Sequence, residues 1–254
     1  MTSRNPITDL QELALRAMLA ELGTISELAK TKIWEPWHLT LWQHLIPEFV
    51  VSYKALIASC QQKDLSASAW MTRNLLELTV WVAYCVGSRD NAKRFYDDKA
   101  RDAFDLLDHL KLFAALADKP DTTVSDLIDT TRETLVDRLP AEGYEDIDET
   151  YQQVHHAAKQ LGLGPFFKNT NKLLSKFAHP TAMMVFSFPD EDSRAQASKF
   201  FLVLGTVLCV SSMAEFDRYA NTVGGTTSKS DADKWMSELG LKASLLRGDH
   251  RNTE

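Results

Sequence analysis

The stretch Leu65–Val86, LSASAWMTRNLLELTVWVAYCV, decides the fold class of this 254-residue chain. It is largely apolar, and its only charged side chains are Arg73 and Glu77, which stand near its middle beside Asn74. Charges at the centre of a membrane span are costly because lipid cannot solvate them. The stretch is therefore predicted to be a core helix of a soluble helical bundle.

The rest of the chain shows the same helical pattern. Apolar residues recur three and four positions apart between a few breaks formed by ten Gly and eight Pro. Pro47 interrupts Trp37–Cys60, which predicts either a kinked helix or two helices there. The fold class is predicted as all-α, a multi-helix bundle forming a single domain over residues 1–254. A short helix is expected near 230–246 and a polar tail at 247–254.

Charge is unevenly distributed along the chain. The 28 Lys and Arg against 35 Asp and Glu give a net charge of −7, which disfavours a strongly basic nucleic-acid-binding protein. Between Asp118 and Glu149, eleven acidic and three basic residues give a local charge of −8. This segment is predicted to form an acidic helical hairpin at 118–149. It is either a solvated surface or a lid or docking surface for a basic partner.

Compartment is inferred from the cysteines and from the apolar runs. Cys60, Cys85 and Cys209 lie far apart in apolar stretches, which is typical of buried free thiols in a reducing cytosol. No apolar run follows the first residues, so no secretory signal is expected. Phe200–Met213 is shorter than the roughly 20 residues of a membrane-spanning helix. We therefore expect a cytoplasmic protein that does not enter a membrane.

The pair Arg73 and Glu77 is the first candidate site. The two residues are four apart and share one helical face, with aromatic residues nearby. Burying ions costs several kcal/mol each unless they are paired and hydrogen-bonded, and a bundle that needed only stability could use Leu at both positions. The alternative is a structural pair that ties a neighbouring helix end or loop carbonyls in place.

A second candidate site lies near the end of the predicted helix that leads to His179. Pro180 predicts that the helix ends there. The polar residues of this helix are expected on one face and its apolar residues on the other. The polar set is Lys172, Ser175, Lys176 and His179, and the apolar set is Phe166, Thr170, Leu173, Leu174 and Phe177. His179 is either an acid, base or anion ligand oriented by Ser175, or a histidine that only caps the helix end.

A third pattern places Asp98, Asp102, Asp105 and His109 on one helical face. Metal sites in helical bundles use such spacings, but a matching Glu-x-x-His partner helix is not evident. We therefore predict a solvated acidic face, with no metal and no cofactor. The sequence also lacks a glycine-rich phosphate loop, a Gly-x-Ser-x-Gly motif and a His-Glu-x-x-His motif, which excludes several large enzyme classes.

Taken together, the Arg-x-x-x-Glu helix, a following helix with Arg94 and Phe95, and a Ser-x-x-x-His helix end resemble a family of uncharacterised bacterial helical proteins, a domain of unknown function. The resemblance covers roughly residues 65–185. More distantly, the layout resembles the helical HEPN superfamily, many of whose members are RNases or bind nucleotides. The RNase motif of that superfamily is Arg, four to six residues, then His. Here seven residues separate Arg101 from His109, and no Arg has the required spacing.

These observations favour a ligand- or partner-binding protein. Its polar pocket would be lined by Arg73, Glu77, Ser175, Lys176 and His179. In that pocket Arg73 would bind a small anion, Glu77 would orient Arg73, and His179 would supply a second donor. The alternative is a divergent HEPN-like, metal-independent ribonuclease or nucleotide-handling enzyme with His179 as general acid or base; a purely structural role is the third hypothesis. A protein partner and a homo-oligomer stay open, and RNA is not favoured.

Overall fold

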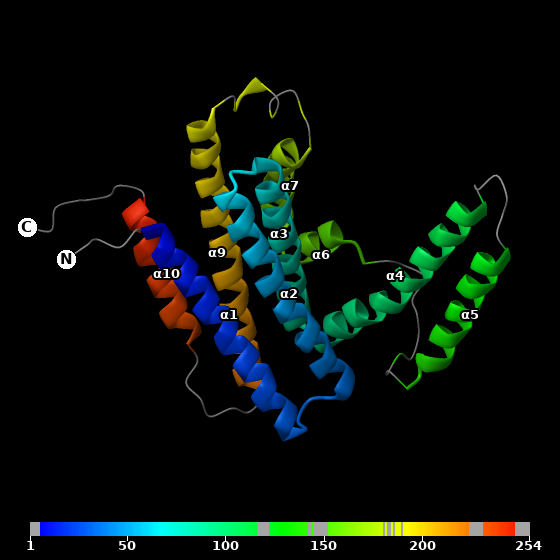
Figure 1. Cartoon of the computed structure of the whole chain (residues 1–254). Helices are drawn as coiled ribbons and strands as arrows, with labels where there is room; N and C mark the ends of the chain where they lie inside the picture. The colour runs from blue at the N-terminus through cyan, green and yellow to red at the C-terminus, as the bar shows by residue number, and fades with distance from the viewer. Residues whose placement is uncertain are drawn as a thin grey trace, which may run out of the picture.

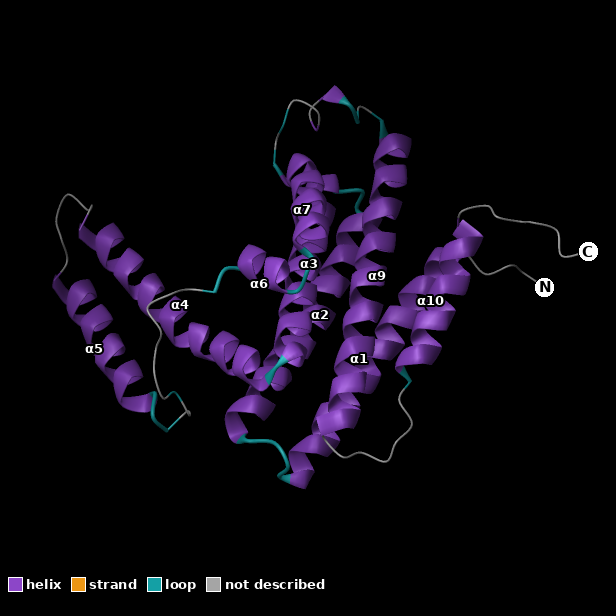
Figure 2. Ribbon diagram, turned by 180° about the vertical axis from the view of Figure 1, so that it is seen from behind, coloured by secondary structure: helices purple, strands orange, loops and turns teal. Residues whose placement is uncertain are grey.

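The structure, a computed structural model, describes residues 6–115, 122–141, 144, 152–179, 181, 184, 186–188, 190–223 and 231–246. Within these ranges the regular structure is helical, as Figure 2 shows. The helices are α1 (Pro6–Thr31), α2 (Pro36–Gln61), α3 (Leu65–Gly87), α4 (Arg89–Ala115), α5 (Thr122–Arg138), α6 (Val154–Gln160), α7 (Gly164–Ala178), α9 (Glu191–Val223) and α10 (Ala232–Leu246). The predicted all-α fold is confirmed.

Helices α3 and α9 form the centre of the bundle. α9 packs against α1, α2, α3 and α10, while α3 also contacts α2, α4, α6 and α7 (Figure 1). The core between them contains large, fully buried side chains, among them Trp42, Phe49, Tyr53, Phe201 and Phe216. Each such side chain contributes about 1.5–3 kcal/mol on leaving water, so this core is the main source of stability.

α9 approaches α2 and α3 most closely at Gly205. A Cβ atom built on Gly205 would lie 2.3 Å from a methyl carbon of Leu56 and 3.1 Å from one of Leu75. Both leucines are fully buried and cannot move aside into solvent. Glycine is therefore required here because only a bare backbone lets the three helices meet.

An aromatic cluster joins the start of α2 to the end of α9. The His38 ring stacks on Trp34 at 4.6 Å between centroids, and the Tyr219 hydroxyl lies 2.8 Å from His38 Nε2. Burial, and then the charge of Arg89, lower the pKa of His38 to about 4. The His38 imidazole is therefore a neutral part of the core at physiological pH.

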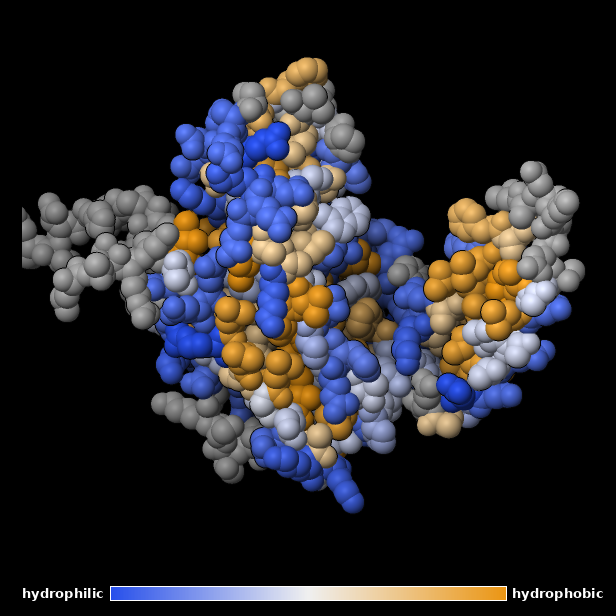
Figure 3. Space-filling view, in the orientation of Figure 1, coloured by the Kyte–Doolittle hydropathy of each residue, from blue (hydrophilic) through white to orange (hydrophobic). Residues whose placement is uncertain are grey.

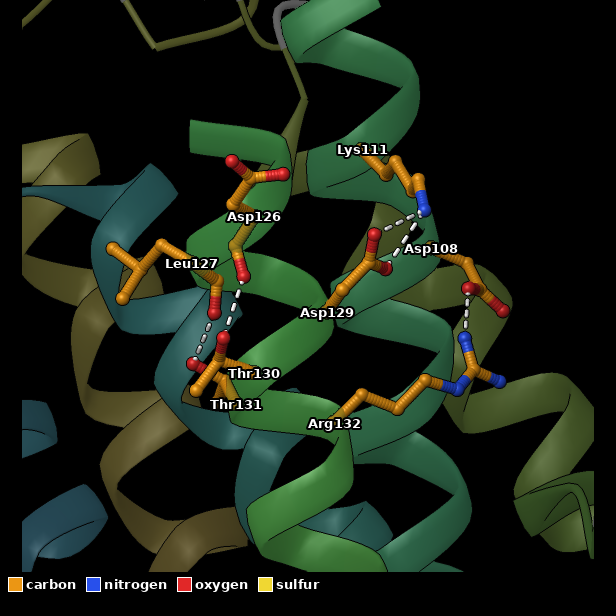
Figure 4. A network of polar contacts seen from close by, with 8 residues as sticks. All are labelled: Asp108, Lys111, Asp126, Leu127, Asp129, Thr130, Thr131 and Arg132. Atoms are coloured by element: carbon orange, nitrogen blue, oxygen red, sulfur yellow. Dashed lines mark hydrogen bonds and ion pairs between the residues drawn. The ribbon is translucent and has the colours of Figure 1, made fainter. Parts of the chain in front are cut away.

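The second half of α4 and the whole of α5 form a hairpin that projects from the bundle (Figure 1, Figure 2). Two ion pairs join its helices, Lys111–Asp129 at 2.7 Å and Arg132–Asp108 (Figure 4). At 100° per residue, the opposite face of the hairpin is apolar and exposed, and Figure 3 shows apolar surface gathered there. Its members include Leu106, Leu110, Phe113, Val124 and Leu127.

Several boundary predictions can now be compared with the structure. α10 confirms the C-terminal helix, and α2 runs through Pro47 as one helix. Of the acidic segment 118–149, α5 covers residues 122–138 and packs on α4. Most other residues of that segment lie outside the described ranges, as does the tail 247–254.

Among the described helices, α9 is the one whose length and composition resemble those of a membrane-spanning helix. By length and composition it could cross a membrane, and 61% of its most apolar 18-residue window is buried inside the fold. Its contacts with four other helices explain that apolar composition as a core role.

Cys60, Cys85 and Cys209 are free thiols, and the last two are buried, with burial raising the pKa of both.

Candidate functional site

The first half of α3 and the end of α7 lie side by side, and local chemistry fixes their ends. The Asp64 side chain caps α3 by accepting the Ala67 N–H at 3.0 Å. α7 ends at Ala178, and His179 has the extended backbone (φ −111°, ψ 153°) that a following proline favours. The Ser66 hydroxyl donates to the Ala178 carbonyl at 3.0 Å. This bond ties the start of α3 to the end of α7.

Three side chains gather at this junction near the indole ring of Trp70. Arg73 Nε donates to Glu77 Oε1 at 3.1 Å, so the predicted pair forms. The guanidinium carbon of Arg73 lies 5.4 Å from the Trp70 ring centroid, within the range of a cation–π contact. The His179 ring meets the same indole edge to face at 6.1 Å. We call Trp70, Arg73, Glu77 and His179 the Trp70 cluster.

The Trp70 cluster is partly open to water. The Arg73 and Glu77 side chains are 27% and 33% exposed, Trp70 is 42% exposed, and His179 is exposed. Within the described part of the chain, the two terminal nitrogens of Arg73, Nη1 and Nη2, have no hydrogen-bond acceptor. Arg73 is therefore held by its Nε while its outer donors stay available.

Ser175 and Lys176 take other contacts than those expected. The Ser175 hydroxyl donates to the Asn171 carbonyl at 2.7 Å, within α7, and makes no hydrogen bond to His179 in the described structure. Lys176 is exposed, and its carbonyl accepts the Thr181 hydroxyl at 2.8 Å. The hydrogen bonds of Ser175 therefore do not orient the His179 imidazole.

The predicted apolar face of α7 was wrong in part. Leu174 is fully buried as expected, but Phe166 and Leu173 are 49% and 42% exposed, and Phe167 is buried instead. The reason is that α7 packs against both α3 and α6, so the direction of its buried face is set by two neighbours.

A pocket of about 680 Å³ lies between α2, α3 and α4. Its size falls within the range of small-molecule sites. The lining combines apolar and aromatic side chains with several polar ones. The lining includes Glu48, Trp81, Tyr96, Asp98, Asp102 and Gln152.

Asp98 is the residue that sequence reasoning placed wrongly. It was expected on a solvated acidic face, but it is only 8% exposed. The backbone N–H of Gln152 donates a hydrogen bond to its carboxylate. Burial, and next the charge of Asp102, raise the pKa of Asp98 to about 6. Asp105 and His109, farther along α4, are exposed as predicted.

Metal binding receives no support from the geometry of the described residues. Among them, no three His, Cys, Asp or Glu side chains are placed to share an ion. Of the four side chains predicted to share one face of α4, Asp98 is buried, and both Asp98 and the exposed Asp102 line the pocket.

A family model matches residues 43–196, more than half of the chain, and its description is a family of unknown function, DUF5677. The chain belongs to DUF5677. No curated protein and no solved structure gives a significant match. The DUF5677 match runs from within α2 to the start of α9, so it includes the Trp70 cluster and all of the pocket lining except Thr40 and Leu41.

The match confirms the predicted family of unknown function, and it carries no link to the HEPN superfamily. Of the residues that form these two sites, sequence reasoning missed Trp70 as the contact between Arg73 and His179. It also missed Gln152 entirely. The signal for Trp70 was present, because it lies three residues before Arg73 on the same helical face.

Proposed function

We propose that this DUF5677 protein binds a small anionic ligand at the Trp70 cluster. The observation that carries the proposal is the state of Arg73, whose Nε is engaged by Glu77 while Nη1 and Nη2 have no acceptor among the described residues. A guanidinium held in this way presents parallel N–H donors that match a carboxylate or a phosphate group.

The neighbours of Arg73 suit a ligand that joins an anionic group to a flat apolar part. Trp70 offers partly exposed indole surface next to the guanidinium. The exposed imidazole of His179, which contacts the Trp70 indole edge to face, is a second hydrogen-bond donor. Glu77 limits how far Arg73 can turn, so less side-chain freedom is lost on binding.

We favour binding over catalysis for this site. A general base is normally oriented by a second group that hydrogen-bonds to it. The His179 imidazole has a ring contact with Trp70 and no such hydrogen bond within the described structure. The HEPN-like nuclease hypothesis therefore gains no specific support from this geometry.

The proposal is tested by calorimetric titration with three anionic probes: benzoate, inorganic phosphate and adenosine monophosphate. Neutral counterparts, benzyl alcohol and adenosine, are titrated in parallel. We expect at least one anion to bind. Arg73→Lys should weaken the affinity for that anion at least about tenfold, which is about 1.4 kcal/mol, because lysine keeps the positive charge but lacks the paired N–H donors of the guanidinium group.

Arg16→Lys is the matched control, because Arg16 is an exposed arginine on α1 that pairs with Glu238. It should leave anion binding unchanged. The proposal fails if no anionic probe binds at millimolar concentration, if the neutral counterparts bind equally well, or if Arg73→Lys binds like the wild type.

A further inference from the structure

The pocket between α2, α3 and α4 is a second site, separate from the Trp70 cluster. Its residues on α3 are Leu78 and Trp81, which lie five and eight positions after Arg73, about 7.5 Å and 12 Å along a helix. None of the residues of the Trp70 cluster lines this pocket. What the pocket binds can therefore be argued, and tested, independently of the proposed function.

Two buried polar atoms in the pocket lack partners. Asp98 is 8% exposed and Gln152 is 4% exposed, and both line the cavity. Asp98 Oδ2 and Gln152 Nε2 are buried and have no hydrogen-bond partner among the residues that the structure describes. Native proteins leave few such atoms unsatisfied, because each one costs free energy. An occupant that donates to Asp98 and also offers an acceptor to Gln152 would satisfy both.

The charge of the lining favours a cation. Glu48, Asp98 and Asp102 contribute three carboxylates, against the single ammonium group of Lys99. None of the three carboxylates forms an ion pair within the described residues; the positive charges of Arg101 and Arg94 stabilise the ionised form of Asp98 without an ion-pair contact. A buried carboxylate without a paired cation is a strong attractor for one.

The aromatic residues of the pocket favour an organic cation over a metal ion. Trp81 stacks on Phe95 at 4.4 Å, and Tyr96 also lines the wall. Aromatic faces attract organic ammonium and guanidinium groups and bury the apolar part of such ligands. As stated above, the described carboxylates and imidazoles are not grouped for metal binding.

We infer that this pocket binds a small organic cation, a primary amine or guanidine with a flat apolar body. Its cationic group bonds to Asp98, and its apolar body packs against Trp81. The bond between the cationic group and Asp98 defines the site; an acceptor atom beside that group would add a hydrogen bond from Gln152 but is not required for binding.

Phenethylamine is the test probe, because it joins a primary ammonium group to an aromatic ring. The neutral comparison is 2-phenylethanol, which has the same size and shape. Binding to the full chain is measured by calorimetry and by the change in tryptophan fluorescence, to which Trp81 contributes. We expect phenethylamine to bind at least about tenfold more tightly than 2-phenylethanol, because a carboxylate bonds a charged donor more strongly than a neutral one.

Asp98→Asn should remove this preference for the amine while leaving the protein folded, since it replaces a buried charge by a neutral group that can still accept the Gln152 N–H. The matched control is Asp105→Asn, an exposed carboxylate on the same helix that does not line the pocket; it should bind phenethylamine like the wild type. The inference is overturned if phenethylamine does not bind, if 2-phenylethanol binds equally well, or if Asp98→Asn binds the amine unchanged.

Discussion

Replacing Glu21 by Gln should make the protein markedly less sensitive to rising pH. Glu21 lies on α1 and is 1% exposed, and its carboxyl oxygen Oε2 has no hydrogen-bond partner among the described residues. Burial, and next the negative charge of Asp217, raise its pKa from 4.5 to about 8. In the folded protein Glu21 is therefore protonated at neutral pH, whereas in the unfolded chain it is ionised.

The sign and size of the effect follow from this difference. Above pH 4.5 the unfolded chain releases the proton while the folded protein keeps it, so the free energy of unfolding falls as pH rises towards 8. The loss is about 1.36 kcal/mol per pH unit, or about 2.7 kcal/mol between pH 5.5 and pH 7.5. Glu21→Gln does not titrate and avoids this loss.

The assay is urea unfolding of both proteins at pH 5.5, 6.5 and 7.5. The stability of Glu21→Gln relative to the wild type should rise by about 2.7 kcal/mol across this range. The control is Glu27→Gln on the same helix, whose exposed carboxylate pairs with Lys30; its curve should run parallel to the wild type. A Glu21→Gln difference that is the same at pH 5.5 and pH 7.5 would refute the reasoning.

Two other predictions concern the core. Burial lowers the pKa of His38 to about 4, so as pH falls the unfolded chain takes up a proton on this residue before the folded protein does. The free energy of unfolding of the wild type should therefore fall by about 2 kcal/mol between pH 7 and pH 5. His38→Gln should abolish this fall, whereas the control His44→Gln, at an exposed histidine, should retain it. Gly205→Ala should lower stability by about 1–3 kcal/mol, because its methyl group would collide with the buried Leu56. Gly23→Ala, in open space on α1, should instead stabilise by about 0.5–1 kcal/mol, with both alanine variants measured by urea unfolding. Equal effects of the two alanines would contradict this account of α9 packing.

Much of the fold could be predicted because its causes are local. The spacing of apolar residues predicted helices throughout, and Pro180 predicted the end of α7 at His179. The pair of Arg73 and Glu77 follows from four-residue spacing on one helix, and it forms at 3.1 Å. Within a helix, neighbouring side chains are placed by the backbone itself, so sequence spacing is enough.

The candidate sites were less predictable where two distant segments meet. Helical spacing placed Asp98 on one face with Asp102, Asp105 and His109, and so towards water, but Asp98 is buried and accepts a hydrogen bond from the backbone of Gln152. Likewise, helical spacing could not reveal that Trp70 contacts both Arg73 and His179, because α7 is brought beside α3 only by packing.

The sequence by itself determined that the chain is helical, where several helices begin and end, and that Arg73 and Glu77 pair. These features depend on residues within one or two turns of each other. Only the tertiary structure decided that His179 joins Arg73 around Trp70 and that Asp98 is buried in a pocket. Burial of a side chain is the sum of what every neighbouring element covers, and those neighbours come from parts of the chain that no local pattern relates.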